Sequence, residues 1–235
     1  VTDVNEAPVI TSNGGGDTDS DSFAENSTSA VTTVTSTDVD AGDTATYSKS
    51  GADADNFTIN SSTGELTFVS APDYEIPADT GGDNIYIVDV VVTDSGSLTD
   101  TQTLTITVTD VNEAPVITSA SSASFAENST STVITITSDD VDSDNVTYGI
   151  SGTDEDDFNI NSSSGALTFK TAPNYESPTD SDTNREYVII ITATDDGPGN
   201  LTDTQTLTIT VTDVNEAPVI TSASIASFAE NSTST

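Results

Sequence analysis

Residues Thr101–Thr109 read Thr-Gln-Thr-Leu-Thr-Ile-Thr-Val-Thr, a strict alternation of polar and aliphatic side chains. Because successive side chains of a β-strand point to opposite faces, Leu104, Ile106 and Val108 would share one face and the threonines the other. This pattern predicts a strand with one buried side and one solvent-facing side. The abundance of Thr and Val also disfavours helix.

The same period of two residues recurs along the chain. Inward faces are predicted for Tyr86, Val88, Val90 and Val92, and for their counterparts Tyr187, Ile189, Ile191 and Ala193. Shorter strands are predicted at 30–37, 44–48, 57–60 and 65–69, with a turn at Ser62–Gly64 between the last two. With the segment around Phe23, each unit has about seven strands, which predicts an all-β fold, a Greek-key β-sandwich.

Two motifs repeat at intervals of about a hundred residues, the size of one small domain. Asp-Val-Asn-Glu-Ala-Pro-Val-Ile-Thr begins at Asp3, Asp110 and Asp213, and Phe-Ala-Glu-Asn begins at Phe23, Phe125 and Phe228. We therefore predict the linker end of a preceding repeat at 1–6, two repeats at 7–110 and 111–213, and the start of a truncated third repeat at 214–235. Because Val1 opens within a motif, the chain is expected to be a piece of a longer protein.

The charge of the chain excludes several classes of function. Its 235 residues include 40 acidic and 3 basic side chains, no histidine and no cysteine, for a formal net charge of −37. Binding of nucleic acid or anionic membranes requires clustered Lys and Arg, so neither partner is expected. No apolar run approaches the length of a membrane span, so no direct membrane insertion is expected.

The same composition argues against catalysis. Without His or Cys, most nucleophile–base pairs and the common zinc ligands are missing. Carboxylate pairs such as Glu155 with Asp157 could serve a glycosidase, but chance pairs are expected among so many acids. We predict that the chain is not an enzyme. Clustered carboxylates instead favour hard divalent cations such as calcium.

Six short blocks occur in a fixed order and recur in the second repeat. In the first repeat they are Phe23–Asn26, Asp38–Asp40, Phe57–Gly64, Pro72–Glu75, Val92–Asp94 and Asp110–Pro115. Together they resemble the cadherin repeat family. The resemblance implies tandem cadherin or immunoglobulin-like sandwiches arranged end to end, with calcium bound where consecutive repeats meet.

The sequence departs from the family pattern in the linkers. Glu113 and Glu216 stand where cadherins usually have Asp, and Ala114 and Ala217 where they have an Asn that acts through its backbone carbonyl. Asn174 replaces the Asp found at Asp73, which is expected to weaken the second junction. The chain lacks the N-terminal Trp that animal cadherins exchange. With its near-identical repeats it looks more like the cadherin-like arrays of large bacterial surface adhesins.

Calcium takes six to eight oxygen ligands, more than one short peptide supplies, so several loops must converge. A sandwich presents its loops at two ends, which lets neighbouring domains share a site. For the complete junction the resemblance implies side chains of Glu25, Asp73, Glu75, Asp110, Asn112, Glu113, Asp140, Asp142 and Asp195, with carbonyls of Val111 and Ala114. These would hold two or three ions.

The two ends of the chain carry half-junctions by the same matching. The first comprises Asp3, Asn5, Glu6, Asp38, Asp40 and Asp94, and the last Glu127, Glu176, Asp213, Asn215 and Glu216. The acidic loops Asp17–Asp21 and Asp140–Asp144 resemble EF-hand starts, but they lack the Gly at position six and the Glu at position twelve.

The expected function is a calcium-rigidified extracellular spacer or adhesion segment of a large surface or secreted adhesin. Its partners would be calcium ions and neighbouring repeats of the same chain. An alternative stays open, in which the repeats are a calcium-dependent recognition module that binds like repeats or a surface polysaccharide. Either reading places the chain outside the cell or on its surface.

Overall fold

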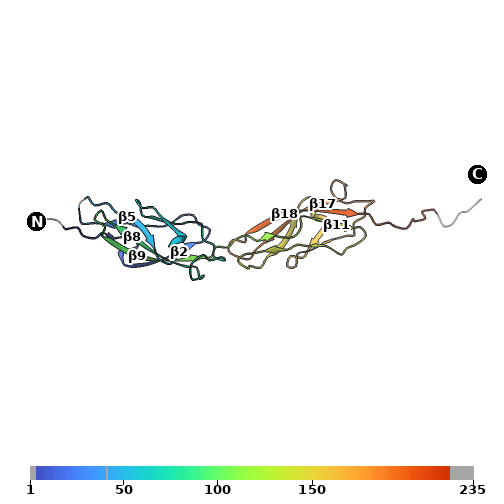
Figure 1. The fold of residues 1–235 in the computed structure, drawn as a ribbon. Coiled ribbons are helices and arrows are strands. Elements are labelled where there is room, and N and C mark those ends of the chain that lie inside the picture. The colour runs from blue at the N-terminus through green and yellow to red at the C-terminus, as the bar shows by residue number, and fades with distance from the viewer. Residues whose placement is uncertain (1–3, 41, 223–235) are drawn as a thin grey trace, which may run out of the picture. The chain divides into compact units, whose positions relative to one another are not determined.

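A computed structural model describes residues 4–40 and 42–222. It divides into two compact units, Val1–Glu113 and Ala114–Thr235, which are coloured in sequence order in Figure 1. Asp3, a predicted ligand, and the third Phe-Ala-Glu-Asn block at Phe228 lie outside the described residues.

Both units are sandwiches of a four-stranded and a three-stranded sheet, which confirms the predicted fold class. The first unit contains β1 (Val9–Ile10), β2 (Thr18–Ala24), β3 (Ala30–Thr33), β4 (Ser36–Thr37), β5 (Thr46–Ser50), β6 (Phe57–Ile59), β7 (Glu65–Phe68), β8 (Ile85–Thr93) and β9 (Thr99–Thr109). Its sheets have the strand orders β2-β9-β8-β5 and β3-β7-β6, and β1 pairs with β4. Short 3-10 helices lie at Asn13–Gly15 and Ala54–Asn56.

The second unit repeats this topology. It contains β10 (Val116–Ile117), β11 (Ser122–Ala126), β12 (Thr132–Thr135), β13 (Ser138–Asp139), β14 (Thr147–Ser151), β15 (Phe158–Ile160), β16 (Ala166–Phe169), β17 (Glu186–Thr194) and β18 (Thr202–Thr212), with a 3-10 helix at Glu155–Asp157. The sheets are β11-β18-β17-β14 and β12-β16-β15, and β10 pairs with β13.

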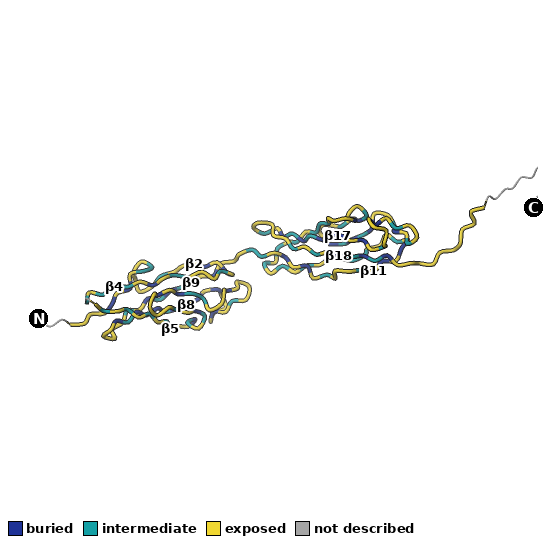
Figure 2. The backbone as a smooth tube through the Cα atoms, turned by 90° about the horizontal axis from the view of Figure 1, so that it is seen from above, coloured by how far each residue is buried: buried dark blue, intermediate teal, exposed yellow. Residues whose placement is uncertain are grey.

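The predicted alternation sets the core. Tyr86, Val88, Val90 and Val92 of β8 and Leu104, Ile106 and Val108 of β9 are all buried, as are Tyr187, Ile189, Ile191 and Ala193 of β17. Figure 2 shows buried and exposed residues alternating along these strands. Aromatic rings also pack in the core of the first unit, where Phe68 and Tyr86 form an edge-to-face pair with ring centroids 5.1 Å apart. Fully burying each large side chain contributes about 1.5–3 kcal/mol.

The predicted strand 30–37 is wrong in one respect, because it forms two strands with different partners. β3 pairs with β7, whereas β4 pairs with β1. Between them the N–H of Val34 donates to the carbonyl of Gly64, 2.9 Å away. Gly64 has a left-handed φ of 73°, and a Cβ there would lie 2.1 Å from the Val34 oxygen. This close approach of the hairpin interrupts the strand.

Each four-stranded sheet contains one parallel pair, formed by the strands that come first and last along the chain in that sheet. β2 pairs with β9 through seven residues, and β11 pairs with β18 through five. The first unit carries a glycine-rich stretch, Asn13–Asp17, that the second lacks. Gln102 fastens this stretch, since its amide donates to the Gly16 carbonyl at 2.7 Å.

Candidate metal centres

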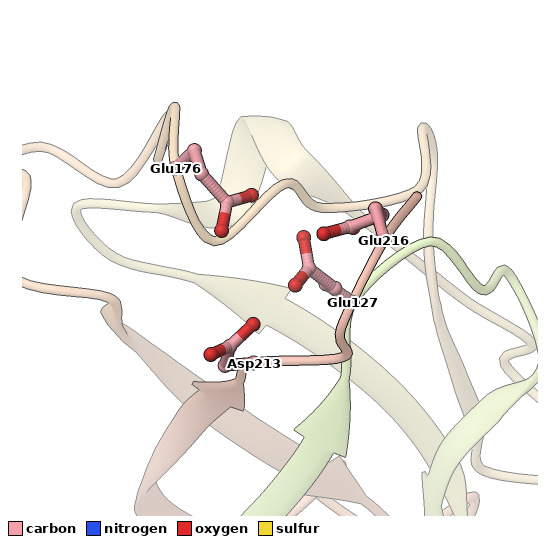
Figure 3. Close-up of side chains that lie close together, drawn as sticks. All are labelled: Glu127, Glu176, Asp213 and Glu216. Carbon is pink, nitrogen blue, oxygen red and sulfur yellow. The ribbon is translucent and has the colours of Figure 1, made fainter. Parts of the chain in front are cut away.

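Four carboxylates gather at one end of the second unit. One oxygen from each of Glu127, Glu176, Asp213 and Glu216 lies within 4.8 Å of the others (Figure 3). Glu127 directly follows β11 and Asp213 directly follows β18, so the parallel pairing of these strands brings the two side by side. Glu176 comes from the loop between β16 and β17. Such close like charges repel strongly unless a cation neutralises them.

Glu127 is the buried centre of this cluster, with 3% of its surface exposed. Its two carboxylate oxygens accept the backbone N–H groups of Tyr175 and Val214, each at 2.8 Å. The hydrogen bond from Tyr175 lowers the pKa of Glu127 most, and that from Val214 lowers it further. Together they outweigh burial, which alone would raise this pKa. The carboxylate therefore stays ionised and ties the Glu176 loop to the segment that follows β18.

The first unit has the equivalent cluster. Oxygens of Glu25, Asp73 and Glu75 lie within 4.8 Å of one another, and Glu25 is likewise only 3% exposed. Glu25 accepts the N–H of Tyr74 at 2.7 Å and that of Val111 at 2.8 Å. The loop that carries Asp73 and Glu75 and the segment after β9 thus meet at one buried carboxylate.

A second kind of cluster occupies the opposite end of the first unit. Asp38, Asp40 and Asp43 bring oxygens within 4.8 Å of one another in the loop after β4. The Asp38 carboxylate accepts the N–H of Asp40, and Asp40 accepts that of Glu6, both at 2.8 Å. Among the described residues, the solvent-shielded Oδ2 atoms of Asp38 and Asp43 have no hydrogen-bond partner. Such oxygens suit a metal ion.

Asp94, which follows β8, is hydrogen-bonded to Asn5. Asp94 is buried and accepts the side-chain amide of Asn5 at 3.0 Å and the N–H of Leu98 at 2.8 Å. The segment before β1 is therefore held to the turn after β8. Two predicted ligands, Asn5 and Asp94, thus contact each other directly.

In the second unit, Asp140, Asp142 and Asp144 lie in the corresponding loop after β13, and Asp195 directly follows β17. Asp140 accepts the N–H groups of Asp142 and Asp144 at 3.1 and 3.4 Å. Burial raises the pKa of Asp144, and four neighbouring carboxylates raise it further, those of Asp196, Asp140, Asp195 and Asp142. Asp195 is 2% exposed and accepts the N–H of Leu201 at 2.9 Å. An open hollow borders this loop, lined partly by Asp140, Asp144 and Tyr148.

Sequence reasoning missed Asp43 and Asp144, because neither belongs to a motif with fixed spacing. The remaining predicted ligands lie in the segments that follow β9 and β18, namely Asp110, Asn112, Glu113, Ala114 and Asn215. Coordination by the carbonyls of Val111 and Ala114 stays a prediction. The donor set throughout is oxygen only, which fits calcium or another hard cation and does not fit zinc.

The fold and its acidic loops define a tandem array of adhesion-type β-sandwiches, and comparison with known families agrees. The cadherin domain model matches residues 20–109 and 121–212. The chain belongs to the cadherin domain family, whose domains are non-enzymatic adhesion modules. A comparison with curated protein sequences finds no match.

Solved structures support the fold. A structure of Drosophila N-cadherin EC1-4 is 20% identical with a TM-score of 0.57, and the match covers 89% of this chain and 50% of that one. Human protocadherin-24 EC1-2 is 25% identical with a TM-score of 0.56, covering 90% and 100%. Mouse cadherin-23 EC22-24 is 23% identical with a TM-score of 0.50, covering 88% and 65%. The chain thus spans half the length of the fly structure.

The tandem arrangement therefore consists of cadherin repeats of the extracellular type. Within the described ranges, the structure contains no helix with the length and apolar character needed to cross a membrane.

Proposed function

We propose that these repeats are a calcium-rigidified extracellular spacer of a large surface or secreted adhesin, of the bacterial kind indicated by the near-identical repeats. The observation that carries the proposal is the recurrence of one carboxylate cluster, centred on a buried glutamate, at the same place in both units. Bound calcium would neutralise the carboxylates and tie their loops together.

The proposed ligands at the complete junction come from both repeats. Glu25, Asp73, Glu75, Asp110, Asn112 and Glu113 would form one half, with carbonyls of Val111 and Ala114, and Asp140, Asp142 and Asp195 the other. Asp144 is added to the second half because it lies near the carboxylates of Asp140, Asp142 and Asp195. Asp43 is added to the separate half-junction of the first unit because it clusters with Asp38 and Asp40. The eight carboxylates of the motif-derived set would carry about −8, a charge suited to two or three calcium ions.

The calcium concentration on either side of the cell membrane would then decide whether the sites are occupied. Extracellular cadherin-type sites of about 10⁻⁴–10⁻³ M affinity fill at millimolar calcium and stay empty at cytosolic concentrations. Newly made chain would keep its repeats loosely linked until export. Outside the cell, mass action would stabilise the ordered junction.

Small-angle X-ray scattering with 5 mM calcium (about five times the largest dissociation constant expected for such sites) and then with EDTA tests the spacer role. The chain should show a narrower distribution of interatomic distances and a changed maximum dimension in calcium. An Asp110→Asn variant should respond less, whereas Asp17→Asn, an equal charge change in an exposed loop, should behave as the wild type. The same maximum dimension in calcium and in EDTA would contradict the proposal.

Sedimentation velocity with calcium and a glycan array separate the spacer from a recognition module. A monomer without glycan signal supports the spacer. Calcium-dependent self-association or glycan binding would favour the alternative.

A further inference from the structure

An asparagine follows the buried glutamate in both units and reaches the linker. The side-chain amide of Asn26 donates to the carboxylate of Glu113, and that of Asn128 donates to Glu216 at 2.6 Å. The paired residues are 87 and 88 positions apart in sequence. The same contact therefore forms twice, between the turn after β2 and the segment after β9, and between the turn after β11 and the segment after β18.

The backbone N–H of each asparagine also donates a hydrogen bond to a third segment, the loop before β8 or β17. The N–H of Asn26 donates to the Pro72 carbonyl, and that of Asn128 to Pro173, both at 2.9 Å. Pro72 opens the loop that carries Asp73 and Glu75. Both asparagines adopt left-handed φ angles, 58° and 61°, which Asn tolerates better than most residues.

In the two linkers, Glu113 and Glu216 stand at positions where the cadherin resemblance implies Asp. Glutamate is longer by one methylene, which adds a rotatable bond and lets the carboxylate sample solvent. Figure 3 shows the Glu216 carboxylate turned toward Glu127. An amide is a suitable restraint, because it donates a hydrogen bond without cancelling the negative charge that a cation needs.

We infer that Asn26 and Asn128 are positioning residues that aim the linker glutamates at the metal. The inference rests on the proposed calcium function. The asparagine amide restrains the longer side chain, so glutamate acts where the family uses aspartate. Groups that orient metal ligands in this way typically change metal affinity about 10- to 100-fold when they are removed.

The experiment uses the full chain with both asparagines replaced. Asn26→Gly with Asn128→Gly removes the amides but keeps residues that accept a left-handed φ. Calcium affinity by isothermal titration should fall about tenfold, while the melting temperature in EDTA should stay near that of the wild type. Ser27→Gly with Ser129→Gly, the next residues in the same turns, is the matched control and should bind calcium normally.

A coupling measurement separates positioning from a simple turn preference. In a background of Glu113→Ala and Glu216→Ala, the glycine substitutions should lower calcium affinity no further. The side-chain amide NMR signals of Asn26 and Asn128 in EDTA should also shift when the glutamates are replaced. Equal calcium affinity of wild type and glycine variants would overturn the inference, as would an affinity loss that persists without the glutamates. A wild-type chain that binds no calcium would instead remove the proposed function itself.

Discussion

Asp73 and Asn174 occupy equivalent positions and make the same local contact. The Asp73 carboxylate accepts the N–H of Ile76, and the Asn174 carbonyl oxygen accepts that of Ser177, both at 2.8 Å. The amide thus preserves the turn but removes one negative charge. At this position the two units therefore differ in charge and not in the local hydrogen bond.

Replacing Asn174 by Asp should therefore raise the calcium affinity of the second-unit cluster, by about tenfold, because affinity rises with the charge of the ligand set. Isothermal titration of the N174D chain measures it. Asn159→Asp, the same change on the exposed face of β15, is the control and should leave the affinity unaltered. If both variants gained affinity equally, general charge and not ligation would be responsible.

Asp53 is a structural residue rather than a ligand, and its role depends on pH. It is 3% exposed and accepts the N–H of Ile87 and the N–H and hydroxyl of Thr80, each at 2.7 Å. Burial would raise the pKa of Asp53, but these three hydrogen bonds outweigh it, so the pKa is lowered. The ionised form thus links the start of the 3-10 helix to β8.

A lowered pKa in the folded state means that the contribution of Asp53 is complete above the unfolded Asp value of about 3.9 and is lost as pH falls through the folded value. Asp53→Asn should cost about 2–4 kcal/mol at pH 7 and progressively less below pH 4. Thermal unfolding at several pH values in EDTA tests this. Asp55→Asn, exposed in the same helix, should be nearly neutral, and a pH-independent cost of D53N would refute the assignment.

At the scale of elements, the long strands could be predicted because each residue of β8 and β9 alternates between core and solvent. The division of residues 30–37 could not, since it depends on Gly64, which approaches from a different hairpin. The same limit applied to the metal clusters. Glu25 and Asp73 belong to motifs of fixed spacing, whereas Asp43 and Asp144 join through loop conformations that no periodicity encodes.

Gly64 and Gly165 should tolerate no side chain. A Cβ at Gly165 would lie 2.2 Å from the Ile136 carbonyl oxygen, as at Gly64, and both residues have left-handed φ angles. Each Gly→Ala substitution should destabilise its unit by about 2–4 kcal/mol. In calorimetry this corresponds to a melting temperature lower by at least about 8 °C.

Gly149 provides the matched control for these substitutions. It lies in β14, and a Cβ there would meet no atom within 4 Å. Gly149→Ala should therefore change stability by less than about 1 kcal/mol. Comparable losses for Gly149→Ala and Gly165→Ala would mean that steric contact is not the cause.

For the whole molecule, a net charge of −37 with 3 basic side chains sets the dependence on solution conditions. Self-repulsion between carboxylates destabilises compact states, and salt can screen only part of it. Calcium bound at discrete clusters should do more than a general increase in ionic strength.

Calcium at 5 mM should accordingly stabilise the folded chain by about 2 kcal/mol for each site of 10⁻⁴ M affinity. Differential scanning calorimetry should show a larger rise in melting temperature with 5 mM calcium than with added sodium chloride of equal ionic strength in EDTA. Equal rises would indicate screening alone.

The parallel pairing of β2 with β9 and of β11 with β18 has a mechanical consequence. When the two ends of a unit are pulled apart, parallel terminal strands slide along each other, so their hydrogen bonds are loaded together in shear instead of opening one by one. Seven paired residues resist in the first unit and five in the second. The second unit should therefore rupture at the lower force in single-molecule stretching, so the two units would unfold one after the other as the load on the chain rises.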